Sequence, residues 1–136
     1  MKALSITEPY ATLIRNGTKR IETRSWKTNY RGELFIHASS TKIPKEYRSN
    51  NELMELVDEN DLRFGQIVCR CKLIDCIKMD DAFIEDIRKN HPTEYICGFY
   101  EDGRYGWVLD DIIPVETGKV KGSLGLWNYN LEEDET

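Results

Sequence analysis

Hydrophobic and polar positions follow strand-like and helix-like spacings in the first third of the chain. Residues 3–6 (ALSI) predict a short strand, and residues 10–15 (YATLIR), preceded by a proline, predict a helix with Thr7 or Glu8 as its cap. Asn16-Gly17 predicts the end of that helix. Residues 33–39 (ELFIHAS) predict a second, buried strand.

Residues 20–26 (RIETRSW), between these segments, alternate as a strand does. The period of two predicts Arg20, Glu22 and Arg24 on one face and Ile21 and Thr23 on the other. We therefore expect a charged strand face directly after the first helix.

The rest of the chain predicts further strands and two helices. Residues 44–60 have helical spacing and predict one helix, and residues 80–90 predict a helix that starts at Asp80 or Asp81. Further strands are expected over residues 66–79, with a bulge, over residues 107–115, with Pro114 at the end or edge, and over residues 123–130. Residues 95–100 fit either a strand or a packed loop.

The predicted strands outnumber the helices and never form repeated strand–helix–strand units. This order indicates an α+β fold, a small mixed or antiparallel β-barrel with flanking helices. The length of 136 residues predicts one domain over residues 1–130, followed by an acidic tail over residues 131–136.

Composition narrows the class of protein. Hydrophobic residues make up 40% of the chain, and no apolar run approaches the ~20 residues of a membrane span. Without a recognisable signal peptide, we expect a soluble, cytoplasmic protein that does not associate with membranes. Four cysteines at C-x-C-x4-C and position 97 lack zinc-site spacing, so we expect buried, reduced thiols, no metal and no cofactor.

Charge is distributed unevenly along the chain. The formal net charge is -5, yet the stretch between residues 15 and 31 holds six basic side chains and one acid, Glu22. The basic residues are Arg15, Lys19, Arg20, Arg24, Lys27 and Arg31. The acidic tail carries four acids and accounts for most of the net charge of -5, so the net charge does not argue against an anionic ligand.

Several motifs resemble one known family. The patterns are LSI-x-x-PYA-x-L-I-x-x-G-x-K-x-x-E-x-R-x-W from residue 4, RG-x-L-x-IHAS from residue 31, and then GWVLDDIIPV, KG and LGLW. Together they resemble the ASCH (activating signal cointegrator homology) domain of the PUA-like superfamily. The resemblance implies a PUA-like β-barrel, a cleft beside the first helix, and binding of RNA, DNA or nucleosides.

The chain departs from this pattern at two positions. Members often carry glutamine where this chain has Glu8, which adds a second negative charge near the expected cleft. Some small superfamily members resemble amidohydrolases acting on acetylated cytidine, with lysine and threonine in the spacing K-x-x-T. Here Glu22 stands three residues after Lys19, so only Lys19 corresponds to their catalytic set.

Lys19, Glu22 and Arg24 form the central candidate site. Two cations would attract a phosphate, and Glu22 would accept a hydrogen bond from an amino group or a 2'-hydroxyl. The alternative is a ladder of exposed salt bridges without a ligand. The resemblance favours the ligand site.

Aromatic and basic residues after this strand are typical of single-strand binding. Trp26 and Tyr30 interleave with Arg24, Lys27 and Arg31, as where bases stack on rings and cations follow phosphates. Trp26 could equally plug the barrel end. His37, Trp107 and Trp127 are expected to be structural.

The sequence therefore predicts a nucleic-acid-binding module for RNA, single strands or a nucleoside, with a cleft for one base or nucleotide. Candidate ligand-binding residues are Glu8, Lys19, Glu22, Arg24, Trp26, Tyr30 and Arg31. The alternative is a small hydrolase of a modified nucleoside (N4-acetylcytidine amidohydrolase-like) or of RNA, with Lys19 and Glu22 as the acid/base pair. A protein partner for the acidic tail and helices is a third possibility.

Overall fold

A computed structural model of the 136-residue chain describes residues 1–130; the predicted acidic tail lies outside the described residues. The strands are β1 (Lys2–Ile6), β2 (Ile21–Arg24), β3 (Gly32–Ala38), β4 (Ile67–Lys78), β5 (Tyr105–Pro114) and β6 (Leu126–Asn128). The helices are α1 (Tyr10–Arg15), α2 (Lys45–Arg48), α3 (Asn51–Met54), the 3-10 helix η1 (Glu59–Asp61), α4 (Asp81–Asn90) and α5 (Pro92–Ile96).

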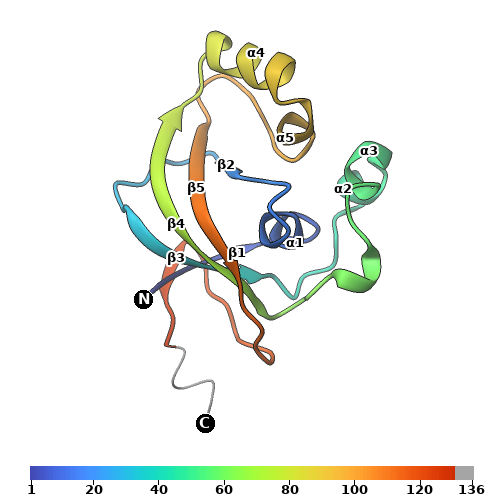
Figure 1. Cartoon of the computed structure of the whole chain (residues 1–136), viewed down its shortest axis with the longest axis vertical. Helices are drawn as coiled ribbons and strands as arrows, with labels where there is room; N and C mark the ends of the chain where they lie inside the picture. The colour runs from blue at the N-terminus through green and yellow to red at the C-terminus, as the bar shows by residue number, and fades with distance from the viewer. Residues whose placement is uncertain (131–136) are drawn as a thin grey trace.

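The six strands form one mixed sheet in the order β2-β5-β4-β3-β1-β6. All neighbours are antiparallel except β1 and β3, which are parallel because α1 and β2 lie between them in the chain. The sheet curls into a half-barrel, with α1 inside the curve and α4 and α5 beyond one end (Figure 1). The predicted α+β, PUA-like fold with flanking helices is confirmed.

Irregular pairing in β4 explains the curl. This strand changes register against β5 between Arg70 and Lys72 and between Leu73 and Asp75, and β3 changes register against β4 between Ile36 and His37. A bulge bends a strand and increases its twist, so the long β4 can follow the curve of the half-barrel from one end to the other. The predicted long, bulged strand is confirmed.

The main core lies between α1 and the concave face of the sheet. Leu13 and Ile14 of α1 are fully buried there against strand residues that include Leu34 and Trp107. Burying one such aliphatic side chain contributes about 1.5–3 kcal/mol, so this contact fixes α1 against the sheet. The position of α1 in turn determines where its ends meet β1 and β2.

The prediction of one helix over residues 44–60 is wrong. The side chain of Asn50 accepts a hydrogen bond from the backbone N–H of Leu53 and begins α3 as a separate helix after α2. Asn and Asp compete in this way with a continuing helix because their short side chains cap N–H groups well. The side chain of Asp80 caps α4 in the same manner, as predicted, and residues 95–100 are the end of α5 followed by a loop.

The remaining expectations concern cysteines, histidine and tryptophan. All four cysteines are free thiols, of which three are buried and Cys76 is partly exposed. His37 is satisfied by Ser5 Oγ at 2.9 Å and the Val120 carbonyl oxygen at 2.7 Å, so the structural assignment is confirmed. Trp107 is fully buried and Trp127 is partly buried.

Within residues 1–130, no helix has the length and apolar character to cross a membrane.

Candidate functional site

A cavity of about 270 Å³ lies where the ends of β1 and β2 meet α1 and the loop after α5. The strands contribute Ser5, Ile6, Glu22, Thr23 and Arg24; the other lining residues are Thr7, Tyr10, Lys19, Ser25, Trp26, Tyr47, Cys97, Gly98, Phe99 and Arg104. Four of the seven predicted ligand-binding residues, Lys19, Glu22, Arg24 and Trp26, therefore come together in its wall.

Lys19 is the most deeply buried charge of the cavity, with 1% of its surface exposed. Its ammonium donates hydrogen bonds to the carbonyl oxygens of Ile21, at 2.7 Å, and Cys97. It also lies 3.4 Å from Glu22 Oε1 and 5.1 Å from the centre of the Tyr10 ring. Three acceptors thus surround a group with three N–H donors, so Lys19 holds β2 and the loop after α5 together.

Glu22 lies between two cations. Glu22 is 6% exposed, and its Oε2 accepts a hydrogen bond from Arg24 Nε at 3.0 Å while Oε1 faces Lys19. Arg24 Nη2 also donates to the Ser5 carbonyl oxygen at 2.9 Å, which joins β2 to β1. Buried ion pairs of this kind are costly to break, since the remaining partner keeps an uncompensated charge.

Arg104, directly before β5, is a cavity residue that sequence reasoning missed. Its Nε donates to the Phe99 carbonyl oxygen at 3.0 Å, and its Nη2 donates to the Thr23 carbonyl oxygen at 3.3 Å. No carboxylate within residues 1–130 pairs with it. The turn before β5 gives no local signal of this position, which depends on the pairing of β5 with β2.

Aromatic rings form another part of the wall. The rings of Tyr10, Tyr47 and Phe99 pack against one another with centroids 5.2 to 6.1 Å apart. Burial, helped by neighbouring groups that include Glu22, raises the pKa of Tyr10 and of Tyr47 above the ordinary value. Both phenols therefore remain neutral hydroxyl groups at physiological pH.

Trp26 packs on the core and also lines the cavity. Its ring packs edge-on against Trp107, with centroids 4.7 Å apart, which covers one end of the core. It also lines the cavity and is 36% exposed, so one part of the indole can be reached from solvent. Base stacking on Trp26 stays a prediction.

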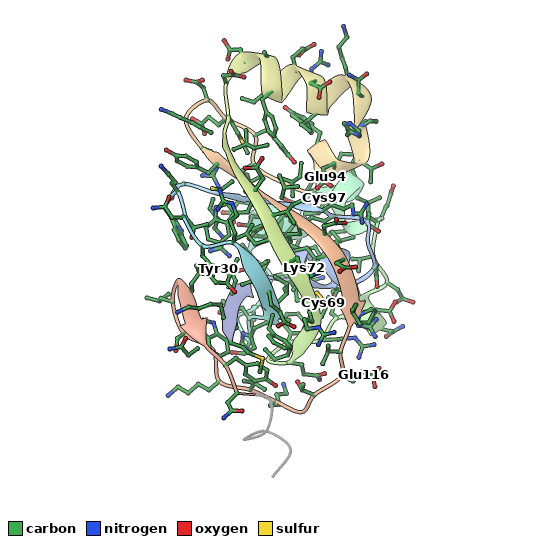
Figure 2. The ribbon with its side chains drawn as sticks, turned by 60° about the vertical axis from the view of Figure 1, so that its left-hand side comes forward. Tyr30, Cys69, Lys72, Glu94, Cys97 and Glu116 are labelled. Atoms are coloured by element: carbon green, nitrogen blue, oxygen red, sulfur yellow. The ribbon has the colours of Figure 1, made fainter. Side chains whose placement is uncertain are left out.

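The other three predicted residues lie outside the cavity wall. Glu8 is fully buried and accepts hydrogen bonds from Thr12 N at 2.8 Å, Thr12 Oγ1 at 2.6 Å and Arg63 N at 2.8 Å. These contacts make Glu8 a brace for the start of α1. Tyr30 donates its hydroxyl hydrogen bond to the Glu33 carbonyl oxygen, and Figure 2 shows it well apart from Cys97 of the cavity wall.

Three of the six basic side chains of the stretch pair with acids from other parts of the chain. Arg20 pairs with Asp110 at 3.5 Å, Arg31 with Asp75 at 3.8 Å, and Arg15 with Glu116 at 3.7 Å. Arg20 also lies outside the cavity wall, so it does not share the site of Glu22 and Arg24 as the alternation predicted. Positive charge is instead concentrated in the cavity wall, which contains the three cations Lys19, Arg24 and Arg104 and one carboxylate, Glu22.

The described residues offer no obvious place for a metal ion. No group of three or more His, Cys, Asp or Glu side chains with suitable geometry occurs within residues 1–130. Burial raises the pKa of the Cys97 thiol to about 11, which leaves it protonated and poorly reactive at neutral pH.

Comparison with known proteins identifies a matching family and two similar proteins. The ASCH domain pattern matches residues 4–118. The chain is 36% identical over 105 residues to human (Homo sapiens) activating signal cointegrator 1, and 35% identical over 102 residues to the mouse (Mus musculus) protein of the same name. The alignments cover 69% and 68% of this chain but 18% of each relative, so the chain matches about a fifth of their length.

Proposed function

The chain belongs to the ASCH domain family, and from this premise we propose that it is a nucleic-acid-binding module whose cavity accepts one base or nucleotide of RNA or another single strand. The observation that carries the proposal is the composition of the cavity wall: three cations, one carboxylate and several aromatic rings around about 270 Å³. The cavity is slightly smaller than the roughly 300–1,000 Å³ that ligand pockets commonly enclose, so it suits a single base rather than a double helix.

Different residues of the cavity wall are suited to different parts of a nucleotide ligand. Glu22 supplies acceptor capacity for a base amino group or a sugar hydroxyl, because a carboxylate has about four lone-pair sites. Arg24 holds that carboxylate by a hydrogen bond of 3.0 Å. The exposed part of Trp26 offers a face for a second, stacked base.

Binding of a short single-stranded RNA of random sequence tests the proposal. The logarithm of the affinity, measured by fluorescence anisotropy, is expected to fall linearly with the logarithm of the salt concentration, by about 0.7 for each phosphate neutralised. Absence of binding even at low salt would contradict the proposal.

Glu22→Gln separates recognition from charge. The substitution is expected to weaken binding of the preferred sequence by about 1–3 kcal/mol, because a donor group of the ligand loses its charged acceptor. Binding of random sequences should stay equal or become tighter. Glu33→Gln, on the outside of β3, is the matched control and should leave the preference intact. Equal loss on every sequence would make Glu22 an organiser of the cations and not a reader of the base.

The hydrolase alternative receives no specific support from the geometry and stays a prediction. To act as a base or nucleophile, Lys19 would have to leave the carbonyl oxygens of Ile21 and Cys97 and the carboxylate of Glu22. Incubation with N4-acetylcytidine and with RNA, followed by detection of acetate or fragments, tests it directly.

A further inference from the structure

Arg104 differs from the other two cations of the cavity in what its charge contacts. Lys19 is enclosed by two carbonyl oxygens and Glu22, and Arg24 is bound to the same carboxylate. The guanidinium of Arg104 contacts the carbonyl oxygens of Phe99 and Thr23, and within residues 1–130 it has no anionic partner. Its positive charge is therefore the least compensated in the cavity.

The guanidinium is also held in place before any ligand arrives. Two hydrogen bonds fix Nε and Nη2, and Cζ lies 5.9 Å from the centre of the Phe99 ring. The backbone of Arg104 is anchored as well, because its carbonyl oxygen accepts a hydrogen bond of 2.8 Å from Met79 N at the end of β4. A guanidinium has five N–H donors, so these two bonds leave three for a ligand.

We propose that Arg104 makes the cavity selective for a phosphorylated ligand, a nucleotide whose phosphate contacts Arg104 while its base faces Glu22. The inference rests on the proposed function and adds to it the residue that binds the phosphate. A charge-assisted hydrogen bond from a fixed arginine is strong, since little side-chain freedom remains to be lost on binding. Lys19, the phosphate contact expected from the sequence, is too enclosed for this role.

A second cavity indicates why phosphate should enter on the Arg104 side. This cavity, of about 460 Å³, lies across the Gly98–Phe99 segment and is lined by Glu52 and Glu101 together with Tyr95, Ile96 and Tyr100. Its wall contains two carboxylates and no basic residue. The Phe99 segment thus separates an acidic cavity that repels phosphate from a cationic cavity that attracts it.

The test compares the four ribonucleosides with their 5'-monophosphates on the full chain, by NMR titration of backbone amides. The wild-type protein is expected to bind at least one monophosphate about 10-fold more tightly than its nucleoside, which corresponds to about 1.4 kcal/mol. Arg104→Gln should reduce this ratio to about 2-fold or less, because the affinity for the monophosphate falls more than the affinity for the nucleoside. Arg88→Gln, the same change of charge on the exposed face of α4, should leave the ratio as in wild type.

A readout on the wild-type protein keeps the inference testable if Arg104→Gln does not fold. The side-chain Nε–Hε signal of Arg104 should shift on addition of the monophosphate and stay in place on addition of the nucleoside. Equal affinity for monophosphate and nucleoside, or a phosphate preference that survives in Arg104→Gln, overturns the inference.

The failure of the proposed function would look different. RNA binding by the wild-type protein without any preference for phosphorylated mononucleotides would overturn the role of Arg104 alone. Absence of binding to RNA, nucleosides and monophosphates together would overturn both.

Discussion

The basic stretch between residues 15 and 31 contains two sets of charges with opposite fates. Lys19 and Glu22 are almost fully buried. Arg24 donates a hydrogen bond to Glu22 and another to the Ser5 carbonyl oxygen, and Lys19 donates one to the Ile21 carbonyl oxygen. Arg20 and Arg31 are exposed and face Asp110 and Asp75 across more than 3 Å.

Burial accounts for the difference between the two sets. Exposed ion pairs in water contribute about 0–1 kcal/mol each, whereas removal of one partner of a buried pair costs about 3–5 kcal/mol. A dense run of basic residues in a sequence therefore need not produce a basic surface. Here it produces a buried network at one site and neutralised pairs elsewhere.

The largest expected effect is that of Lys19→Met. It leaves Glu22 without one of its cations and two carbonyl oxygens without their donor, so we expect the free energy of unfolding to fall by about 3–5 kcal/mol in urea titrations. Lys27→Met is the matched control, since Lys27 is exposed and makes no ion pair within residues 1–130. A loss below about 1 kcal/mol for Lys19→Met would remove the distinction between the two sets.

Glu8→Gln tests a buried carboxylate that is held by neutral donors instead of cations. One acceptor oxygen becomes an NH₂ group that faces N–H or O–H donors of Thr12 and Arg63, at an expected cost of about 1–3 kcal/mol. Glu55→Gln, at an exposed position, should change stability by less than about 0.5 kcal/mol. If Glu8→Gln proves neutral, these donors are satisfied equally well by an amide.

The buried carboxylate of Glu94 is expected to make the stability of the protein depend on pH. Its carboxylate accepts hydrogen bonds from the backbone N–H groups of Arg20, at 2.8 Å, and Ile21, at 3.2 Å, and burial raises its pKa above the ordinary value of 4.5. Because the folded-state pKa is the higher one, this group contributes stability below the unfolded-state pKa. The contribution is lost as pH rises through the folded-state pKa.

The measurement for Glu94 is the free energy of unfolding across the acid range. As pH rises from below 4.5 to neutral, the free energy of unfolding of the wild-type protein should fall relative to that of Glu94→Gln. Glu55→Gln, with an exposed carboxylate, should show no such trend against wild type. The opposite slope for Glu94→Gln would mean that the two hydrogen bonds outweigh desolvation.

The smallest expected effect is that of the exposed pair Arg20 and Asp110. In a double-mutant cycle of Arg20→Gln and Asp110→Asn, we expect a coupling energy of about 0.2–1 kcal/mol that declines as salt is added. A coupling above about 2 kcal/mol would place this pair with the buried set.

Strong local patterns made most of the fold predictable. The strand at residues 3–6, the helix after Pro9 and the bulged strand β4 follow from hydrophobic periods and from proline and glycine signals that act over a few residues. The helix over residues 44–60 was mispredicted because its hydrophobic period continues across Asn50, whose capping of α3 interrupts the chain of helical hydrogen bonds.

The sequence alone determined most of the elements, the fold class, the family and the joint placement of Lys19, Glu22 and Arg24, since these depend on neighbours in the chain. Only the tertiary structure decided which charges are accessible. One of the two carbonyl oxygens that enclose Lys19 belongs to Cys97, 78 residues away, and Arg104 reaches Thr23 across 81 residues. Such contacts arise where β5 pairs with β2 and the loop after α5 packs onto them, and no local period of the sequence encodes that approach.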